Sequence, residues 1–82
     1  MTLFLDVHNI NGVTREAAAA AHQRDLEVQD RYNVKMVNYW LDEANGKIFC
    51  LAEAPSREAA NEVHREAHGL LADEIFEVAE GE

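Results

Sequence analysis

Cysteine, basic residues and long apolar runs are all scarce in this chain of 82 residues, and each scarcity excludes a class of protein. Cys50 is the single cysteine, so no intramolecular disulfide can form, as expected for a reduced cytoplasmic protein. No apolar run is long enough to span a membrane. An aspartate interrupts the apolar N-terminal segment 1–10, which also lacks a basic region, so we do not expect a signal peptide.

The charged residues are strongly biased toward acid. Seven lysine and arginine residues stand against sixteen aspartate and glutamate residues, which gives a net charge of −9. Nucleic acids and anionic membranes both require a basic surface, so neither is expected as a partner, and a transcriptional role is disfavoured. The charge is compatible with binding cations, although acidic surfaces also serve simply to keep proteins soluble.

Apolar periodicity and turn signals divide the chain into six elements. We expect strands over residues 2–8, 33–43, 47–54 and 73–80, and helices over residues 14–31 and 56–68. Thr14 and Ser56 are suitable N-caps, and Gly69 suits a helix end. An Asn-Gly pair at 45–46 suits a hairpin turn. The order β-α-β-β-α-β predicts one domain over residues 1–82 with the ferredoxin-like split fold, an α+β arrangement of a four-stranded antiparallel sheet with two helices on one face.

Two helices can cover only one face of this sheet, yet both faces carry apolar residues. We expect Phe4, Phe49 and Leu51 on the uncovered face, together with Trp40. Monomers seldom expose an apolar patch of that kind. A second copy of the chain is the simplest cover, so the sequence predicts a homodimer packed sheet to sheet. A monomer with an unusually apolar sheet is the alternative.

Histidines indicate a candidate site. His64 and His68 lie four residues apart in the second helix and share one side of it, which is the usual way for a helix to offer two imidazoles to a metal ion. We expect His64 beside the buried stripe of that helix and His68 nearer to solvent. The first strand and the second helix run in the same direction in the split fold, so His8 should lie at the same end of the molecule. Asp6 shares the face of His8, which we expect to meet the partner chain. Imidazole and carboxylate together predict a site for nickel, zinc or copper.

Plainer interpretations of the same residues remain open. A histidine in the last turn of a helix, such as His68, is stabilised by the helix dipole without any ligand. Arg65 stands where a zinc-protease motif requires glutamate, so that motif is absent. Cys50 is expected to be a buried structural cysteine, and His22 an ordinary helix residue. Glu53 ends the third strand, at the far end from the histidines, and would join the metal site only from a two-fold partner.

Residues 49–78 read FCLAEAPSREAANEVHREAHGLLADEIFEV. They combine an FC-x-x-EAP strand end, a histidine-bearing helix that closes with AHGL, and an ADEI-x-EV strand. These features resemble a family of small bacterial ferredoxin-like proteins that includes nickel-binding, nickel-responsive members, and FLDVHNI and VNYWLDEANGK extend the likeness over nearly the whole chain. The resemblance implies a cytoplasmic dimer that binds more than one nickel ion. It also implies sequestering or buffering of nickel rather than catalysis, with His8, His64 and His68 in place as ligands.

Two other functions compete with nickel binding. Dimeric ferredoxin-like barrels also include small monooxygenases and isomerases, in which Asp6, His8 and Glu53 would act as acid–base groups. Tyr39 or Trp40 would then line a substrate cavity at the dimer face. No cofactor fingerprint and no complete set of nucleophile, base and orienting residue supports that interpretation. The remaining alternative is an interaction module, a protein that functions only by forming its dimer.

Overall fold

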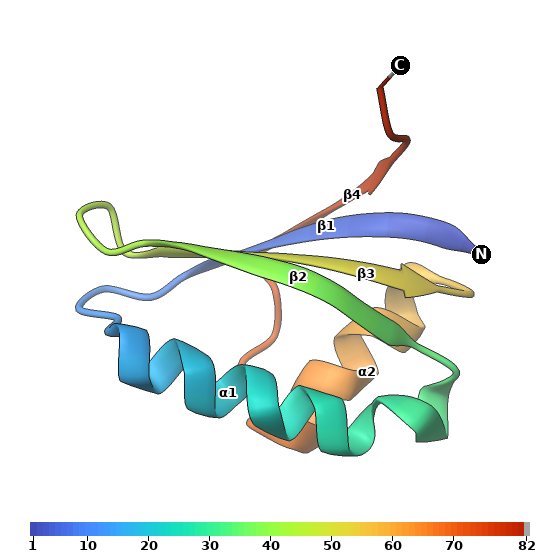
Figure 1. Ribbon diagram of the computed structural model, residues 1–82, viewed down its shortest axis with the longest axis horizontal. Helices are drawn as coiled ribbons and strands as arrows, with labels where there is room; N and C mark the ends of the chain where they lie inside the picture. Colours follow the sequence, from blue (N-terminus) through green and yellow to red (C-terminus); the bar gives the residue numbers. More distant parts are fainter. Residues whose placement is uncertain (82) are drawn as a thin grey trace.

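The computed structural model describes residues 1–81 and has two layers, a sheet and a pair of helices (Figure 1). The elements in chain order are β1 (Thr2–Asn9), α1 (Arg15–Val28), the short 3₁₀ helix η1 (Gln29–Tyr32), β2 (Lys35–Asp42), β3 (Lys47–Ala54), α2 (Arg57–Ala67) and β4 (Glu74–Val78). The strands pair in the order β2-β3-β1-β4, and every pair is antiparallel. Both helices lie against the same side of the sheet. The ferredoxin-like fold that the sequence predicts is therefore confirmed.

Local sequence explains where the helices begin and end. The side chains of Thr14 and Ser56 each accept a hydrogen bond of 3.1 Å from a backbone N–H three residues further on, which confirms both predicted N-caps. At the end of α2, the N–H of Gly69 donates to the carbonyl of His64, and its φ of +78° is one that glycine adopts without strain. None of the helices within residues 1–81 has both the length and the apolar character of a membrane span.

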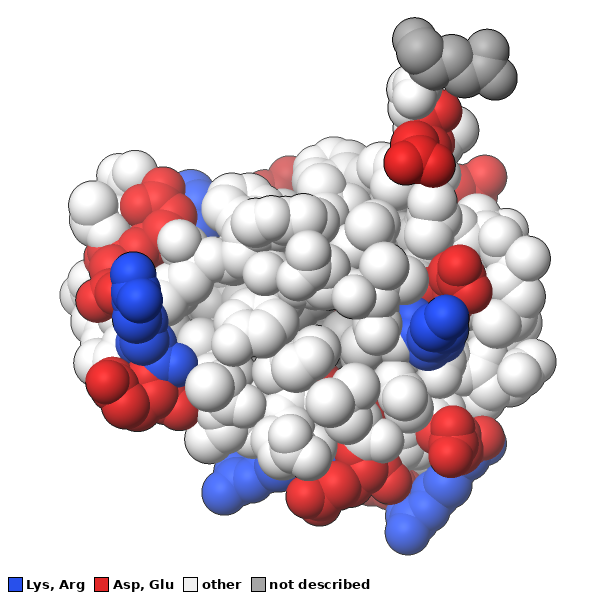
Figure 2. Space-filling view, in the orientation of Figure 1, with Lys and Arg blue, Asp and Glu red and all other residues white. Residues whose placement is uncertain are grey.

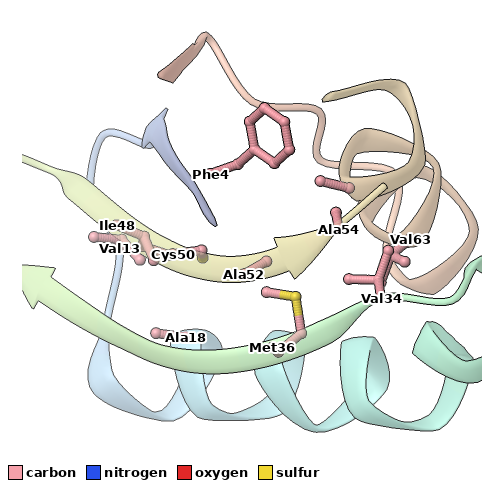
Figure 3. Close-up of a cluster of buried hydrophobic side chains, with 11 residues drawn as sticks. Phe4, Val13, Ala18, Val34, Met36, Ile48, Cys50, Ala52, Ala54 and Val63 are labelled. Carbon is pink, nitrogen blue, oxygen red and sulfur yellow. The ribbon is translucent and has the colours of Figure 1, made fainter. Parts of the chain in front are cut away.

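The hydrophobic core fills the space between the sheet and the helices (Figure 3). Residues of β1 and β3 that face the helices pair across the sheet, Phe4 with Ala52 for example. Helix α2 adds Ala60 and Val63 from the other layer. Many members of the core are small, which lets the helices pack closely on the strands. The buried apolar cluster consists of Phe4, Val13, Ala18, Val34, Met36, Ile48, Cys50, Ala52, Ala54, Ala60 and Val63.

The opposite face of the sheet is open, and the prediction of which residues line it is partly wrong. Phe4 was expected there with Phe49 and Leu51, but Phe4 faces the helices and is buried. Leu5 pairs with Leu51, so the odd-numbered residues of β1 line the open face, and Asp6 lies on the helix-covered side. Alternation shows which residues share a face, but it does not show which face the helices cover. The apolar residues of the open face are Leu3, Leu5, Val7, Trp40, Phe49, Leu51, Phe76 and Val78.

Charged side chains gather at the margins of the view in Figure 2. Uncharged atoms fill its middle, over β2, where Val37 and Trp40 are 46% and 49% exposed. Beyond β4, residues 79–81 lead away from the body of the protein on the open side of the sheet (Figure 1). In this view, residues other than Lys, Arg, Asp and Glu lie over β2, and acidic side chains lie around them.

Candidate metal centre

Five side chains form a continuous polar chain inside the protein, near the end of β1. His64 lies at its centre, with Nδ1 3.0 Å from Oδ1 of Asp25 and Nε2 2.7 Å from Oδ2 of Asp6. Asp6 Oδ1 lies 3.1 Å from Nε2 of His8, and Asp25 Oδ1 lies 3.1 Å from Nε2 of His68. Imidazoles and carboxylates therefore alternate in the order His8, Asp6, His64, Asp25, His68. We call this set the histidine–aspartate chain.

Three elements bring the histidine–aspartate chain together. Asp6 and His8 are two residues apart on β1, so both point to the helix-covered side of the sheet. Asp25 belongs to α1, whereas His64 and His68 occupy the last turn and the C-cap of α2. The ring centroids of His8 and His64 are 4.7 Å apart, which confirms that the end of the first strand meets the end of the second helix.

The histidine–aspartate chain is almost completely removed from water. Asp6 and His64 are 1% exposed, Asp25 is 2% exposed and His8 is 3% exposed. The sequence predicts His64 at the edge of the buried stripe of α2, but the structure places it fully inside. A buried imidazolium or carboxylate is tolerated only where it is paired, and here each ring nitrogen of His64 has its own carboxylate. Those two carboxylates allow His64 to enter the core.

The pairing also sets the charge state of these groups. Burial by itself would lower the pKa of His64, but the hydrogen bonds and negative charges of Asp25 and Asp6 raise it from 6.5 to about 9. Burial opposes the shift of Asp6, whose pKa is lowered from 3.8 to about 2 by its hydrogen bond with His64 and the approach of His8. Burial would also raise the pKa of Asp25, but the hydrogen bonds and charges of His64 and His68 lower it. At neutral pH, His64 is therefore an imidazolium that donates to two carboxylates.

Cys50 extends the site from β3, where it pairs directly with Asp6 in the β1–β3 register. Burial and the neighbouring carboxylates raise the pKa of its thiol, so the thiol stays protonated unless a metal ion binds it. Within residues 1–81, two atoms of the site have no aligned hydrogen-bond partner: Nδ1 of His8, and Oδ1 of Asp6, whose 3.1 Å contact with His8 is poorly oriented. Buried polar atoms normally have partners, and an ion would supply one.

The donor set of this region fits a divalent ion of the nickel, zinc or copper type. Two groups of potential ligands lie close enough to hold an ion, namely Asp6, His8, Cys50 and His64 in the first group and Asp25, His64 and His68 in the second. All ligand atoms within each group lie within 4.8 Å of one another. Bonds of about 2.0–2.3 Å to one ion allow separations of up to roughly 4–4.6 Å, so small shifts suffice. Imidazole, carboxylate and thiolate suit these ions better than calcium or magnesium.

A cavity of about 20 Å³ adjoins the centre and has room for about one water molecule. His8, His22, His64 and His68 all line it. His22 stacks on Tyr39 with ring centroids 4.5 Å apart and belongs to neither ligand group, as expected for an ordinary helix residue.

Glu53 is a predicted ligand that the single chain does not bring to this centre. It pairs with Leu3 on one side and Lys35 on the other, at the end of the sheet remote from His8. It also points to the open face, whereas Asp6 and His8 point to the covered one. Of the five predicted ligands, the structure therefore gathers Asp6, His8, His64 and His68 and leaves Glu53 apart.

Asp25 was missed by sequence reasoning, although it contacts both histidines of α2. The alanine run in α1 makes several faces of that helix equally able to be buried, so no apolar stripe marked the inner one. The only weak signal is a spacing of seven residues, which places Asp25 on the same helix face as the buried Ala18. Cys50 was correctly expected to be buried, but its place beside Asp6 depends on the strand register.

Comparison with known proteins gives two matches. The sequence model of a family described as "Nickel responsive protein SCO4226-like" matches residues 4–78. A crystal structure of SCO4226 from Streptomyces coelicolor A3(2) superposes with a TM-score of 0.91 at 44% sequence identity, covering 98% of this chain and 99% of that chain. No curated protein matches the chain.

Proposed function

This chain belongs to the SCO4226-like family of nickel-responsive proteins, and from that premise we propose that it binds nickel ions and sequesters or buffers them in the cytoplasm. The family description supports nickel as the ion. The buried, protonated thiol of Cys50 fits a reducing compartment. The histidine–aspartate chain, together with Cys50, is the site that we assign to the ion.

One observation carries this proposal: three imidazoles, two carboxylates and a thiol form two adjoining ligand groups in the interior of the protein. A buried carboxylate is costly unless it is paired, and a divalent cation would pair with Asp6 and Asp25 in place of the protons of His64. The same ligands bind zinc and copper, and cells choose among these ions chiefly by availability.

We also propose that the protein is a homodimer packed through the open face of the sheet. Eight apolar residues line that face, and among them Trp40 and Phe76 are 49% and 46% exposed. Apolar surface gathered on one face of a soluble protein commonly marks an interface. A second copy presents the same apolar surface and so matches it by two-fold symmetry.

The first test of nickel binding is calorimetric titration of the metal-free protein at pH 7.5. Wild type, His68→Ala and His22→Ala are titrated in parallel. His68 is near the surface end of the site, so its removal should leave the fold intact, and His22 is the matched control because it lines the cavity outside both ligand groups. We expect wild type and His22→Ala to bind nickel in the micromolar range or tighter, and His68→Ala to bind at least ten-fold more weakly or to lose a site.

The other outcomes separate the parts of the proposal. Absence of binding by all three proteins would refute nickel binding. Equal binding by all three would place the nickel site elsewhere on the chain and leave the histidine–aspartate chain a structural role. A rise in melting temperature with nickel, reversed by a chelator, provides an independent readout, because an ion that binds only the folded state stabilises it.

A further inference from the structure

The imidazole of His68 has a hydrogen-bond partner on each of its nitrogens. The backbone N–H of Leu70 donates to Nδ1 at 3.1 Å, and Nε2 lies 3.1 Å from Oδ1 of Asp25. Because Nδ1 accepts a hydrogen bond, it carries no hydrogen, so the hydrogen of the ring lies on Nε2 and points to the carboxylate. The two partners therefore select one tautomer of His68.

An ion bound by His68 requires the other tautomer. Nε2 faces the carboxylate of Asp25, which belongs with His64 and His68 to one of the two ligand groups, so Nε2 is the nitrogen that would bind the ion. A neutral imidazole that binds an ion through Nε2 carries its hydrogen on Nδ1. Nδ1 then becomes a donor that faces the N–H of Leu70, and the hydrogen bond between them is lost.

We propose that ion binding by His68 releases Leu70 and Leu71 from their closed position, so that the surface of the protein reports whether the buried centre holds an ion. This inference rests on the proposed function, because it requires His68 to be a ligand. The two leucines belong to the α2–β4 connection (residues 68–73), which crosses from the helix layer to the sheet (Figure 1).

Hydrogen bonds anchor the α2–β4 connection on both sides of these two leucines. Before them, the N–H of Gly69 donates to the carbonyl of His64 at 3.0 Å. After them, the N–H of Ala72 donates to Oδ1 of Asn61 at 3.1 Å, and the N–H of Asp73 donates to a carbonyl of β1 at 2.9 Å. Loss of the hydrogen bond to the imidazole would therefore free only the two leucines and leave the rest of the connection in place.

Release of the two leucines would change the apolar surface near the centre. Leu70 is 44% exposed and Leu71 is 49% exposed. The side chain of Leu70 also lines the cavity of about 20 Å³ that borders His68, so it covers part of that cavity. Its movement would uncover the cavity wall and add to the exposed apolar surface, which is the kind of change that another protein can recognise.

Hydrogen exchange at single backbone amides tests this release. Wild type, His68→Asn and His22→Ala are compared at pH 7.5 with and without saturating nickel, and mass-spectrometric fragmentation resolves the individual amides. We expect nickel to speed exchange of the Leu70 amide at least ten-fold in wild type and in His22→Ala. The amides of Ala72 and Asp73 serve as internal references and should not change.

The His68→Asn variant separates ion binding from the hydrogen bond. The side-chain oxygen of asparagine can accept from the N–H of Leu70, but asparagine has no atom in the place of Nε2. The Leu70 amide of this variant should therefore exchange at one slow rate with and without nickel. Circular dichroism checks its fold, and Asp25→Asn takes its place if it does not fold, since that variant removes a charged ligand of the same group.

The remaining outcomes all count against the release. A wild-type protein that binds nickel without faster exchange at Leu70 would exclude the coupling and leave the proposed function standing. Faster exchange in His68→Asn as well would mean that the effect does not pass through the imidazole, and equal acceleration at Ala72 would indicate general loosening of the connection. Absence of nickel binding would end both the proposed function and this inference.

Discussion

Part of β1 reverses the usual distribution of polarity in a sheet, although Phe4 is buried on the covered side. On the covered side, Asp6 and His8 are almost fully buried, at 1% and 3% exposure. On the open side, Leu3 and Leu5 are only half-buried, and Phe76 beside Leu5 is 46% exposed. An antiparallel sheet with one covered face normally buries its apolar side chains and exposes its polar ones.

The buried polar residues of the covered face and the exposed apolar residues of the open face each suit a binding partner, an ion in the first case and a second copy of the chain in the other. Carboxylates and imidazoles enter the core only because they pair with one another, and their atoms form two groups suited to cations. Within residues 1–81 no layer covers the apolar residues of the open face, and a second copy would cover them. The covered face therefore supports the proposed metal binding, and the open face supports the proposed homodimer.

The largest effect is expected from His64→Ala on the covered face. Its removal leaves Asp6 and Asp25 buried without their shared imidazolium, so the free energy of unfolding should fall by about 3–5 kcal/mol. His22→Ala is the matched control, with an expected loss of roughly 1 kcal/mol or less. Urea denaturation of metal-free protein at pH 6, at one protein concentration, measures both. Equal losses in the two variants would show that the pairing does not stabilise the core.

The pH dependence of the metal-free protein should be nearly as large. Because the pKa of His64 is raised from 6.5 to about 9 on folding, its contribution is complete below pH 6.5 and is lost as the pH rises to 9. That loss is on the order of 3 kcal/mol. The pKa of Asp6 is lowered from 3.8 to about 2, so its contribution is present above pH 3.8 and is lost as the pH falls toward 2.

Urea denaturation between about pH 2 and pH 9 checks these directions, which predict greatest stability between about pH 4 and 6.5. Nickel affinity should change in the opposite sense, rising from pH 6.5 to pH 9, because each ion competes with a proton for His64. In the His64→Ala variant the loss of stability above pH 6.5 should disappear. A stability curve that is flat from pH 6.5 to pH 9 in wild type would contradict the raised pKa.

A smaller effect is expected on the open face, where Phe76→Glu places a charge beside Leu5. Burying that charge at a sheet-to-sheet interface should weaken dimerisation at least ten-fold, about 1.4 kcal/mol, while the fold persists. Light scattering after gel filtration measures the oligomeric state. Leu71→Glu is the control, because Leu71 is similarly exposed but lies outside the sheet. A wild-type protein that is monomeric at micromolar concentration would rule out the proposed dimer.

The smallest effect should come from an ion pair on the surface. Glu62 and Arg65 contact each other on the outer side of α2, where water screens the charges. Glu62→Gln should leave the melting temperature unchanged within error, in contrast to variants of the buried pairs. A clear loss of stability would mean that pairing on the surface matters as much as pairing in the core.

Much of the fold was predictable because its signals are local. The N-caps Thr14 and Ser56 act within one helical turn, and the predicted third strand coincides with β3 (Lys47–Ala54). The expected helix to residue 31 ends as α-helix at Val28 and continues as η1 to Tyr32. The site was predictable in part, since His8 and His64 were correctly expected at one end of the molecule.

The sequence by itself determined the order of the elements, the helix caps and the four-residue spacing of His64 and His68, because these depend on near neighbours and on periodicity. The tertiary structure decided which face of β1 the helices cover, and so placed Phe4 and Asp6 inside. It also brought Asp25 to the centre, whereas the place of Glu53 at the far end of the sheet was already expected. The physical reason is that the burial of His64 requires two carboxylates from distant elements, and only long-range strand register and helix packing supply them.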